Sequence, residues 1–221
     1  MSLHPLSDVS AADWFVDSDA DWWTKVTLGP PGFEAYARVL YPLDDGQLAG
    51  NDSRTRSILM DVLREHTTSP HDCFFGLWEG CGYIEATWQW TETEDGRTYR
   101  ASGPEPPSGV DAEPCSAAAF ADDILDGPKV TLQHRKYYLF TGPLEMSGKW
   151  GARDQAPGLP RSSMDGPHLA WPADHAWFLA ADTDPDWIGV GGSQTLIDEL
   201  VADARLNVTL TAYDSANWET Q

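Results

Sequence analysis

The sequence predicts an α+β fold, in which a mostly antiparallel sheet and a few short helices form one main domain spanning residues 1–221. Short runs of alternating apolar and polar residues recur along the chain, and this period of two is typical of strands. The segments with helical spacing stand apart and do not alternate regularly with the strands. Eleven Trp, seven Tyr and seven Phe residues supply core material and argue against general disorder.

The first regular elements are expected between residues 32 and 80. Residues 32–43 (GFEAYARVLYPL) alternate well enough to predict a strand. From Ser53 the apolar residues repeat with helical spacing, and Pro70 closes that segment. Residues 73–80 (CFFGLWEG) form an apolar run with glycine at its end, which predicts a short buried strand.

Residues 83–101 carry the clearest local signal, because two alternating runs flank Asp95-Gly96. An Asp-Gly pair favours the positive φ angles of a two-residue type I′ turn. Such a turn places Glu94 opposite Arg97 and Glu92 opposite Tyr99, with the two tryptophans of WQW on one face. We therefore predict a β-hairpin.

The second half of the chain has two segments that we expect to be irregular, residues 102–114 and 148–167, because both are rich in proline and glycine. Between them we expect a short helix after Ser116 and strands at residues 129–133 and 136–142. After them we expect a strand at 175–182, a helix over about 193–204 and a last strand at 206–213.

The formal net charge of −21 limits the kinds of molecule that the protein is expected to bind. Such a charge repels nucleic acids and anionic membrane surfaces, whereas it favours cations and basic proteins. A merely solvated acidic surface is the other interpretation. The chain has no apolar run of ~20 residues and no signal peptide at its start, so we expect a cytoplasmic protein with three reduced cysteines.

The stretch DTDPDWIGVGGSQTLIDEL offers a cation site and an anion site. Asp182, Asp184 and Asp186 could gather a hard cation, but the glycine and glutamate of an EF-hand loop are missing, so we expect no metal and a polar turn. Gly189 to Ser193 could present N–H groups to an anion at a strand–helix junction. Ser193 could equally be a plain N-cap, and neither the dinucleotide nor the nucleophile-elbow pattern is complete.

Two further constellations are weak. His71, Cys73, Cys81 and Cys115 lack the paired knuckles of a zinc site, so we expect the thiols to pack as small apolar groups. His175 directly follows Asp174, and neighbours on an extended chain point to opposite faces, which argues against a catalytic dyad.

A ligand pocket with aromatic walls is the remaining candidate site. Trp78 with Glu79, and Trp171 with Trp177, could line such a pocket beside His175. The competing interpretation is that these tryptophans fill the core.

Four blocks of the chain resemble successive blocks of an uncharacterised family of cytosolic proteins from high-GC bacteria: GFEAYARVLYPL, FGLWEG, RKYYLFTGPL and WPADHAWFLAADTDPDWIGVGGSQTLIDELVAD. The acidic α+β character and the Trp-rich blocks are also similar to the SMI1/KNR4-like (SUKH) superfamily. Many members of that superfamily are immunity proteins that neutralise toxins by binding. The resemblance to the uncharacterised family implies no known activity and brings no catalytic residue with it. The similarity to the SUKH superfamily is the one that suggests a binding function.

The sequence thus favours a non-enzymatic binding module for a basic protein partner, immunity-like in action and without a cofactor. The alternative is an enzyme or small-molecule-binding protein that uses the Trp-lined pocket.

Overall fold

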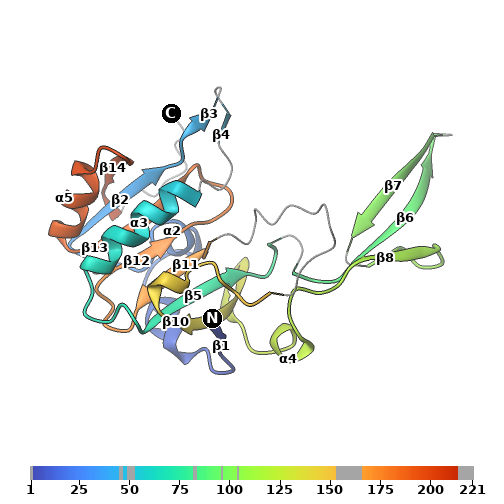
Figure 1. Ribbon diagram of the computed structural model, residues 1–221, viewed down its shortest axis with the longest axis horizontal. Helices are drawn as coiled ribbons and strands as arrows, with labels where there is room; N and C mark the ends of the chain where they lie inside the picture. The colour runs from blue at the N-terminus through green and yellow to red at the C-terminus, as the bar shows by residue number, and fades with distance from the viewer. Residues whose placement is uncertain are drawn as a thin grey trace.

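The computed structural model describes residues 2–44, 47–48, 53–81, 84–95, 97–103, 105–152 and 166–213. Its centre is a nine-stranded sheet in which every pair of neighbours is antiparallel (Figure 1). The strands lie in the order β1 (His4–Pro5), β10 (Arg135–Gly142), β5 (Cys73–Trp78), β11 (Leu169–Pro172), β12 (Phe178–Ala180), β13 (Trp187–Gly192), β2 (Ala35–Leu40) and β14 (Asn207–Thr211), with β9 (Val130–Leu132) also on β10. The predicted α+β class is confirmed.

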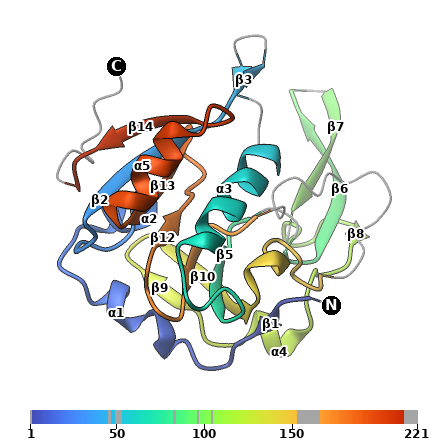
Figure 2. The same cartoon turned by 60° about the vertical axis from the view of Figure 1, so that its left-hand side comes forward.

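Helices cover both faces of this sheet (Figure 2). The helices α3 (Ser53–Glu65) and α5 (Gln194–Ala202) contribute to the core on one face. The 3₁₀ turn η1 (Ser10–Ala12), α1 (Asp13–Val16) and α2 (Trp22–Thr27) contribute to the core on the other. Successive side chains of a strand point to opposite faces, so one strand contributes to both cores. In β10, Phe140 belongs to the first core and Leu139 to the second.

The longer helices confirm the sequence signals. The helix α3 begins at Ser53 and buries the apolar stripe that predicted it. The helix α5 begins after Ser193, whose Oγ accepts a hydrogen bond from the Leu196 N–H at 3.2 Å. An N-cap of this kind satisfies a backbone donor that would otherwise have no partner in the first turn. A short 3₁₀ turn, η2 (Leu144–Met146), follows β10.

The glycine run at Gly189–Gly192, which the sequence placed at a strand–helix junction, is part of the strand β13 (Trp187–Gly192). In β13, which pairs with β12 and β2, a Cβ added to Gly189 would lie 1.9 Å from the carbonyl oxygen of Thr27. One added to Gly191 would lie 2.6 Å from the Phe33 ring. Glycine is therefore required by the close approach of neighbouring chain segments.

A three-stranded sheet projects from the body, and we call residues 87–116 the arm (Figure 1). It contains β6 (Thr87–Glu94), β7 (Arg97–Gly103) and β8 (Ala112–Ser116), with β6 in the middle. The predicted hairpin and its register are confirmed, since Glu94 pairs with Arg97 and Glu92 with Tyr99.

Three boundaries differ from the sequence-based expectations. The segment 102–114 is not wholly irregular, because β7 extends to Gly103 and β8 begins at Ala112, where each finds hydrogen-bonding partners on β6. The helix expected after Ser116 is limited to α4 (Asp122–Leu125). Residues 148–152 and 166–167 lie outside helices and strands, and residues 153–165 lie outside the described part of the chain. A minor ladder joins β3 (Leu43–Asp44) to β4 (Gln47–Leu48).

Candidate functional site

Two of the three aspartates that suggested a metal site, Asp182 and Asp184, bind an arginine side chain. The Asp182 carboxylate accepts hydrogen bonds from Arg135 Nε at 2.9 Å and from the second guanidinium nitrogen at 3.0 Å. Asp184 accepts a further bond from Arg135 at 3.0 Å. This fork geometry is the arrangement in which arginine binds carboxylates most strongly. Asp182 lies two residues after β12, and its buried negative charge is balanced by the positive charge of Arg135.

Arg135 also contacts Trp78, one of the predicted pocket residues. The guanidinium carbon lies 4.9 Å from the centre of the Trp78 ring and 5.8 Å from that of Trp22, so the charge lies against two aromatic rings. The Trp78 backbone N–H donates to His168 Nδ1 at 3.3 Å. Burial lowers the pKa of His168 to about 3, so its ring is neutral near pH 7 and Nδ1 can accept that bond.

Glu79 links the two ends of the chain segment that is inserted between β5 and β10. The strands β5 and β10 are direct neighbours, with Trp78 opposite Tyr137, although the arm and α4 lie between them in the sequence. The Glu79 carboxylate, just after β5, lies 3.7 Å from Lys129 Nζ and 3.9 Å from Lys136 Nζ, on the chain that returns from the arm. Glu79 therefore contacts the base of the insertion.

Trp171 and Trp177 are fully buried on opposite faces of the sheet, so they do not line one pocket. Trp171 stacks on Phe178 with 5.5 Å between ring centroids, in the core that α1 and α2 cover. Trp177 lies in the core that α3 and α5 cover, and its Nε1 donates to the Leu63 carbonyl at 2.9 Å. The structure gives both residues a packing role.

His175 is an exposed residue in a tight turn. It has a φ of 53°, a value that non-glycine residues rarely adopt, and its ring stacks on Trp14 with the centroids 4.1 Å apart. Asp174 bonds other groups, namely the Thr67 and Thr68 hydroxyls and the Thr68 and Ala176 N–H groups. The neighbouring carboxylate therefore closes the turn, and no bond from it to the imidazole orients a catalytic base.

The remaining sequence candidates also have structural positions. Ser193 is the N-cap of α5, as one of its two interpretations held. Cys73 and Cys81 are buried, and burial raises the pKa of the Cys73 thiol to about 12, which keeps it protonated. Cys115 lies on the arm. Within the described ranges, no three His, Cys, Asp or Glu side chains gather as a metal site would require.

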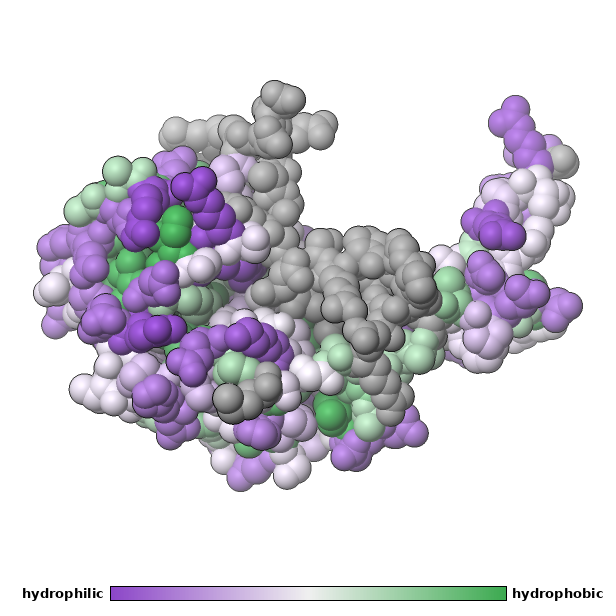
Figure 3. Space-filling view, viewed as in Figure 1, coloured by the Kyte–Doolittle hydropathy of each residue, from purple (hydrophilic) through white to green (hydrophobic). Residues whose placement is uncertain are grey.

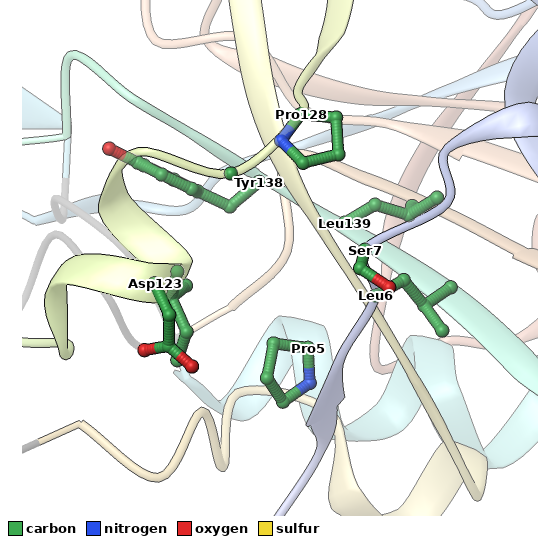
Figure 4. A pocket seen from close by; sticks show the side chains of 9 residues that line it. Pro5, Leu6, Ser7, Asp123, Pro128, Tyr138 and Leu139 are labelled. Atoms are coloured by element: carbon green, nitrogen blue, oxygen red, sulfur yellow. The ribbon is translucent and has the colours of Figure 1, made fainter.

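A cavity of about 120 Å³ lies between the start of the chain and α4 (Figure 4). Pro5, Leu6 and Ser7 face Asp123 and Tyr138 across it. Burial raises the pKa of Tyr138 to about 12, so the phenol is neutral near pH 7. Pockets for organic ligands usually enclose roughly 300–1,000 Å³, so this cavity suits only very small molecules.

The arm projects clear of the body (Figure 3) and carries three aromatic residues, Trp88, Trp90 and Tyr99. Cross-strand register places Trp88, Trp90 and Tyr99 on one face. Trp90 Nε1 donates to Glu92 at 2.7 Å, and the Tyr99 hydroxyl donates to Glu94 at 3.3 Å. Tyr99 is 43% exposed. Among the described residues, no helix makes extensive contacts with this face.

The arm is also acidic, since it carries six acids and two arginines. Glu94, Asp95, Glu105, Asp111 and Glu113 are exposed. A second acidic segment lies at the start of the chain, where the aspartates at positions 8, 13, 17, 19 and 21 are all exposed. Lys25, which follows them, is buried and donates to the Val16 carbonyl.

The sequence alone did not single out Arg135, Trp14 or the arm as parts of a candidate site. Arg135 and Asp182 are 47 residues apart, so no local spacing announces their pairing. The arm did carry a signal, because the hairpin prediction already placed two tryptophans on one face.

The fold and these surfaces define an α+β protein with an aromatic, acidic arm on a two-core body. No protein-family model, curated protein or solved structure matches the chain. No helix in the described residues is long and apolar enough to span a bilayer.

Proposed function

We propose that the protein is a non-enzymatic binding module that uses its arm to bind a basic protein partner, as an immunity protein binds its toxin. The observation that carries the proposal is the arm itself, an aromatic sheet face that projects from the body with an exposed Tyr99. Aromatic residues commonly supply the short-range anchors of protein interfaces.

The charge of the arm favours a cationic partner. The arm carries five exposed carboxylates, and the whole chain has a formal charge of −21. Such a field speeds the encounter with a basic protein and repels nucleic acid and anionic membrane. The exposed aspartates of the first 21 residues add to this long-range attraction.

The positions of the other candidates also support binding over catalysis. Five of the candidates each have a packing, pairing or capping partner in the structure: Trp78, Glu79, Trp171, Trp177 and Ser193. An enzyme with a Trp-lined pocket is the weaker hypothesis for this reason.

The test uses the tagged full chain to isolate a partner, which is then identified, purified and studied by stopped-flow fluorescence. We expect saturable binding whose association rate falls steeply between about 0.05 and 0.5 M NaCl, because screening shortens the reach of the charges. The Glu94→Gln/Glu113→Gln variant should slow association several-fold at low salt. Tyr99→Ala should speed dissociation about tenfold.

The matched control is Glu65→Gln/Asp198→Asn, which removes two exposed charges from α3 and α5. Its association rate should fall less than that of the arm variant. A partner that binds all variants equally well would exclude the arm, and the absence of any saturable basic partner would overturn the function.

A further inference from the structure

One face of the arm combines aromatic rings with carboxylates. Successive residues of a strand point to opposite faces, and Glu92 of β6 lies opposite Tyr99 of β7. Four residues therefore share a face, which we call the aromatic–acid face: Trp90, Glu92, Glu94 and Tyr99. Tyr99 is 43% exposed and Glu94 is also exposed, so other molecules can reach this face from solution.

The indole of Trp90 is held across the sheet at both of its ends. At one end, Nε1 donates a hydrogen bond to Glu92 at 2.7 Å. At the other end, the six-membered ring lies over Gly103, where an added Cβ would be 3.1 Å from Cη2 of Trp90. Glycine at this position lets the ring lie close to the sheet. Trp90 is half-buried, so part of its ring remains accessible as a fixed aromatic platform.

Two carboxylates meet at the Tyr99 hydroxyl. The hydroxyl donates to Glu94 at 3.3 Å, and hydrogen bonding to Glu92 raises the pKa of the phenol. A phenol has one proton, so it cannot satisfy both carboxylates. Two like charges therefore remain close together on this face, and a bound cation would relieve their repulsion.

Within the described structure, the arm's own arginines do not pair with these carboxylates. Arg100 lies opposite Thr91 and belongs to the other face. Arg97 lies opposite Glu94, but no ion pair within 4.0 Å joins the two side chains. A carboxylate has about four acceptor positions, so a single internal hydrogen bond leaves room for an external cation.

The body of the protein shows which cation such a set of groups holds. Arg135 lies against the rings of Trp22 and Trp78. Its guanidinium also donates to Asp182 and Asp184. Two aromatic rings and two carboxylates thus bind one guanidinium. The aromatic–acid face brings the same kinds of group together on the surface of the arm.

We propose that the aromatic–acid face binds an arginine side chain of the basic partner, an inference that rests on the binding function proposed above. The guanidinium stacks on Trp90 and donates two hydrogen bonds to Glu92, and the charge of Glu94 adds to the attraction. A lysine ammonium is a compact, strongly hydrated charge and lacks this planar fork. A divalent metal ion is disfavoured, because no three His, Cys, Asp or Glu side chains gather among the described residues.

The experiment adds two probes, tetra-arginine and tetra-lysine, to the isotope-labelled full chain at constant ionic strength. The indole N–H signal of Trp90, identified by its loss in Trp90→Phe, reports binding in two-dimensional NMR spectra. We expect tetra-arginine to shift this signal with a dissociation constant about tenfold lower than that of tetra-lysine. Glu92→Gln preserves the shape of the side chain and should reduce the difference to less than about twofold.

The matched control is Glu113→Gln, which removes one carboxylate from the other face of the arm, where Glu113 lies opposite Gln89. This variant should keep the preference for arginine. Equal binding of the two peptides by the original protein overturns the proposal, as does a preference that survives Glu92→Gln or disappears in Glu113→Gln.

A second measurement needs no substitution at the site. In the original protein, tetra-arginine should shift the backbone amide signals of β6 and β7 and leave those of α5 unchanged. Shifts confined to residues outside the arm overturn the proposal even if Glu92→Gln fails to fold.

The purified basic partner separates a failure of the arginine site from a failure of the binding function. Replacing the arginines of its interface with lysine should weaken binding on the order of tenfold. Unchanged binding through the arm overturns the arginine site and leaves the binding function in place. Selective binding of tetra-arginine at Trp90 without any saturable protein partner supports the arginine site and overturns the function.

Discussion

At the residue scale, Asp182 is a carboxylate with 3% of its side chain exposed, and Arg135 is the group that makes this burial tolerable. A buried ion costs several kcal/mol unless a well-placed opposite charge and hydrogen bonds replace its water. Hydrogen bonding to Asp182 raises the pKa of Arg135, as expected for a guanidinium stabilised by its partner. The interaction ties β10 to the segment after β12.

The two aspartates that share Arg135 allow a matched comparison. Asp182→Asn removes the charge and one acceptor from a buried fork, so the free energy of unfolding should fall by about 2–4 kcal/mol. Asp184 is 62% exposed, so Asp184→Asn should cost less than about 0.5 kcal/mol. Urea unfolding at neutral pH measures both. Equal effects of the two variants would show that the buried fork is not the source of stability.

At the scale of elements, the arm is an insertion into a hairpin of the body. The strands β5 and β10 pair over six residues without it. At its base, the Ala119 N–H donates to the Ile84 carbonyl at 2.8 Å, so the two ends of the insertion are already adjacent. Ile84, Ala119 and Phe120 belong to the body core, whereas β6, β7 and β8 do not.

Replacing residues 87–116 with a short Gly-Ser linker should therefore leave the body folded. We expect its melting temperature to change by less than about 4 °C, because no described residue of the excised strands belongs to either core. Differential scanning calorimetry provides the measurement. As a control, excision that also removes Ile84 and Phe120 should destabilise the body strongly. Loss of folding after the shorter excision would mean that the arm supports the core.

At the scale of the whole molecule, His168 is buried where distant segments meet. Arg56 of α3 and Arg135 of β10 both disfavour its protonation, and Asp182 opposes them. Burial is the largest cause, and it lowers the pKa of His168 to about 3. The environment of His168 therefore combines α3, β10 and the segment after β12.

This arrangement predicts how stability depends on pH. An imidazole in the unfolded chain has a pKa near 6.5, so between about pH 6.5 and 3 the unfolded chain binds a proton that the folded protein does not. As the pH is lowered across that window, the free energy of unfolding should fall by up to about 1.4 kcal/mol for each pH unit. His168→Gln should remove this component when urea unfolding is repeated between about pH 4.5 and 7.

An exposed histidine provides the control for that slope. The variant His71→Gln changes an exposed histidine and retains His168, so the slope that His168 contributes should remain. A His168→Gln slope identical to that of the original protein would show that the ring is not kept neutral by the fold.

The sequence alone determined the features that depend on neighbours in the chain. Periodicity predicted α3, α5, β2, β5, β10 and β14, and Asp95-Gly96 fixed the hairpin register. Ser193 could be identified as a cap because its partner lies three residues away. The net charge, likewise, is a sum that needs no coordinates.

Only the tertiary structure decided what the candidate site residues do. The strand β13 was missed because its glycines are dictated by Thr27 and Phe33, which lie far away in sequence. Trp171 and Trp177 are separated by the sheet, and Asp182 is committed to Arg135, through contacts that form only when the layers assemble. Local sequence sets backbone preferences, whereas long-range packing chooses the partner of each side chain. The function of a tryptophan or an aspartate depends on that partner.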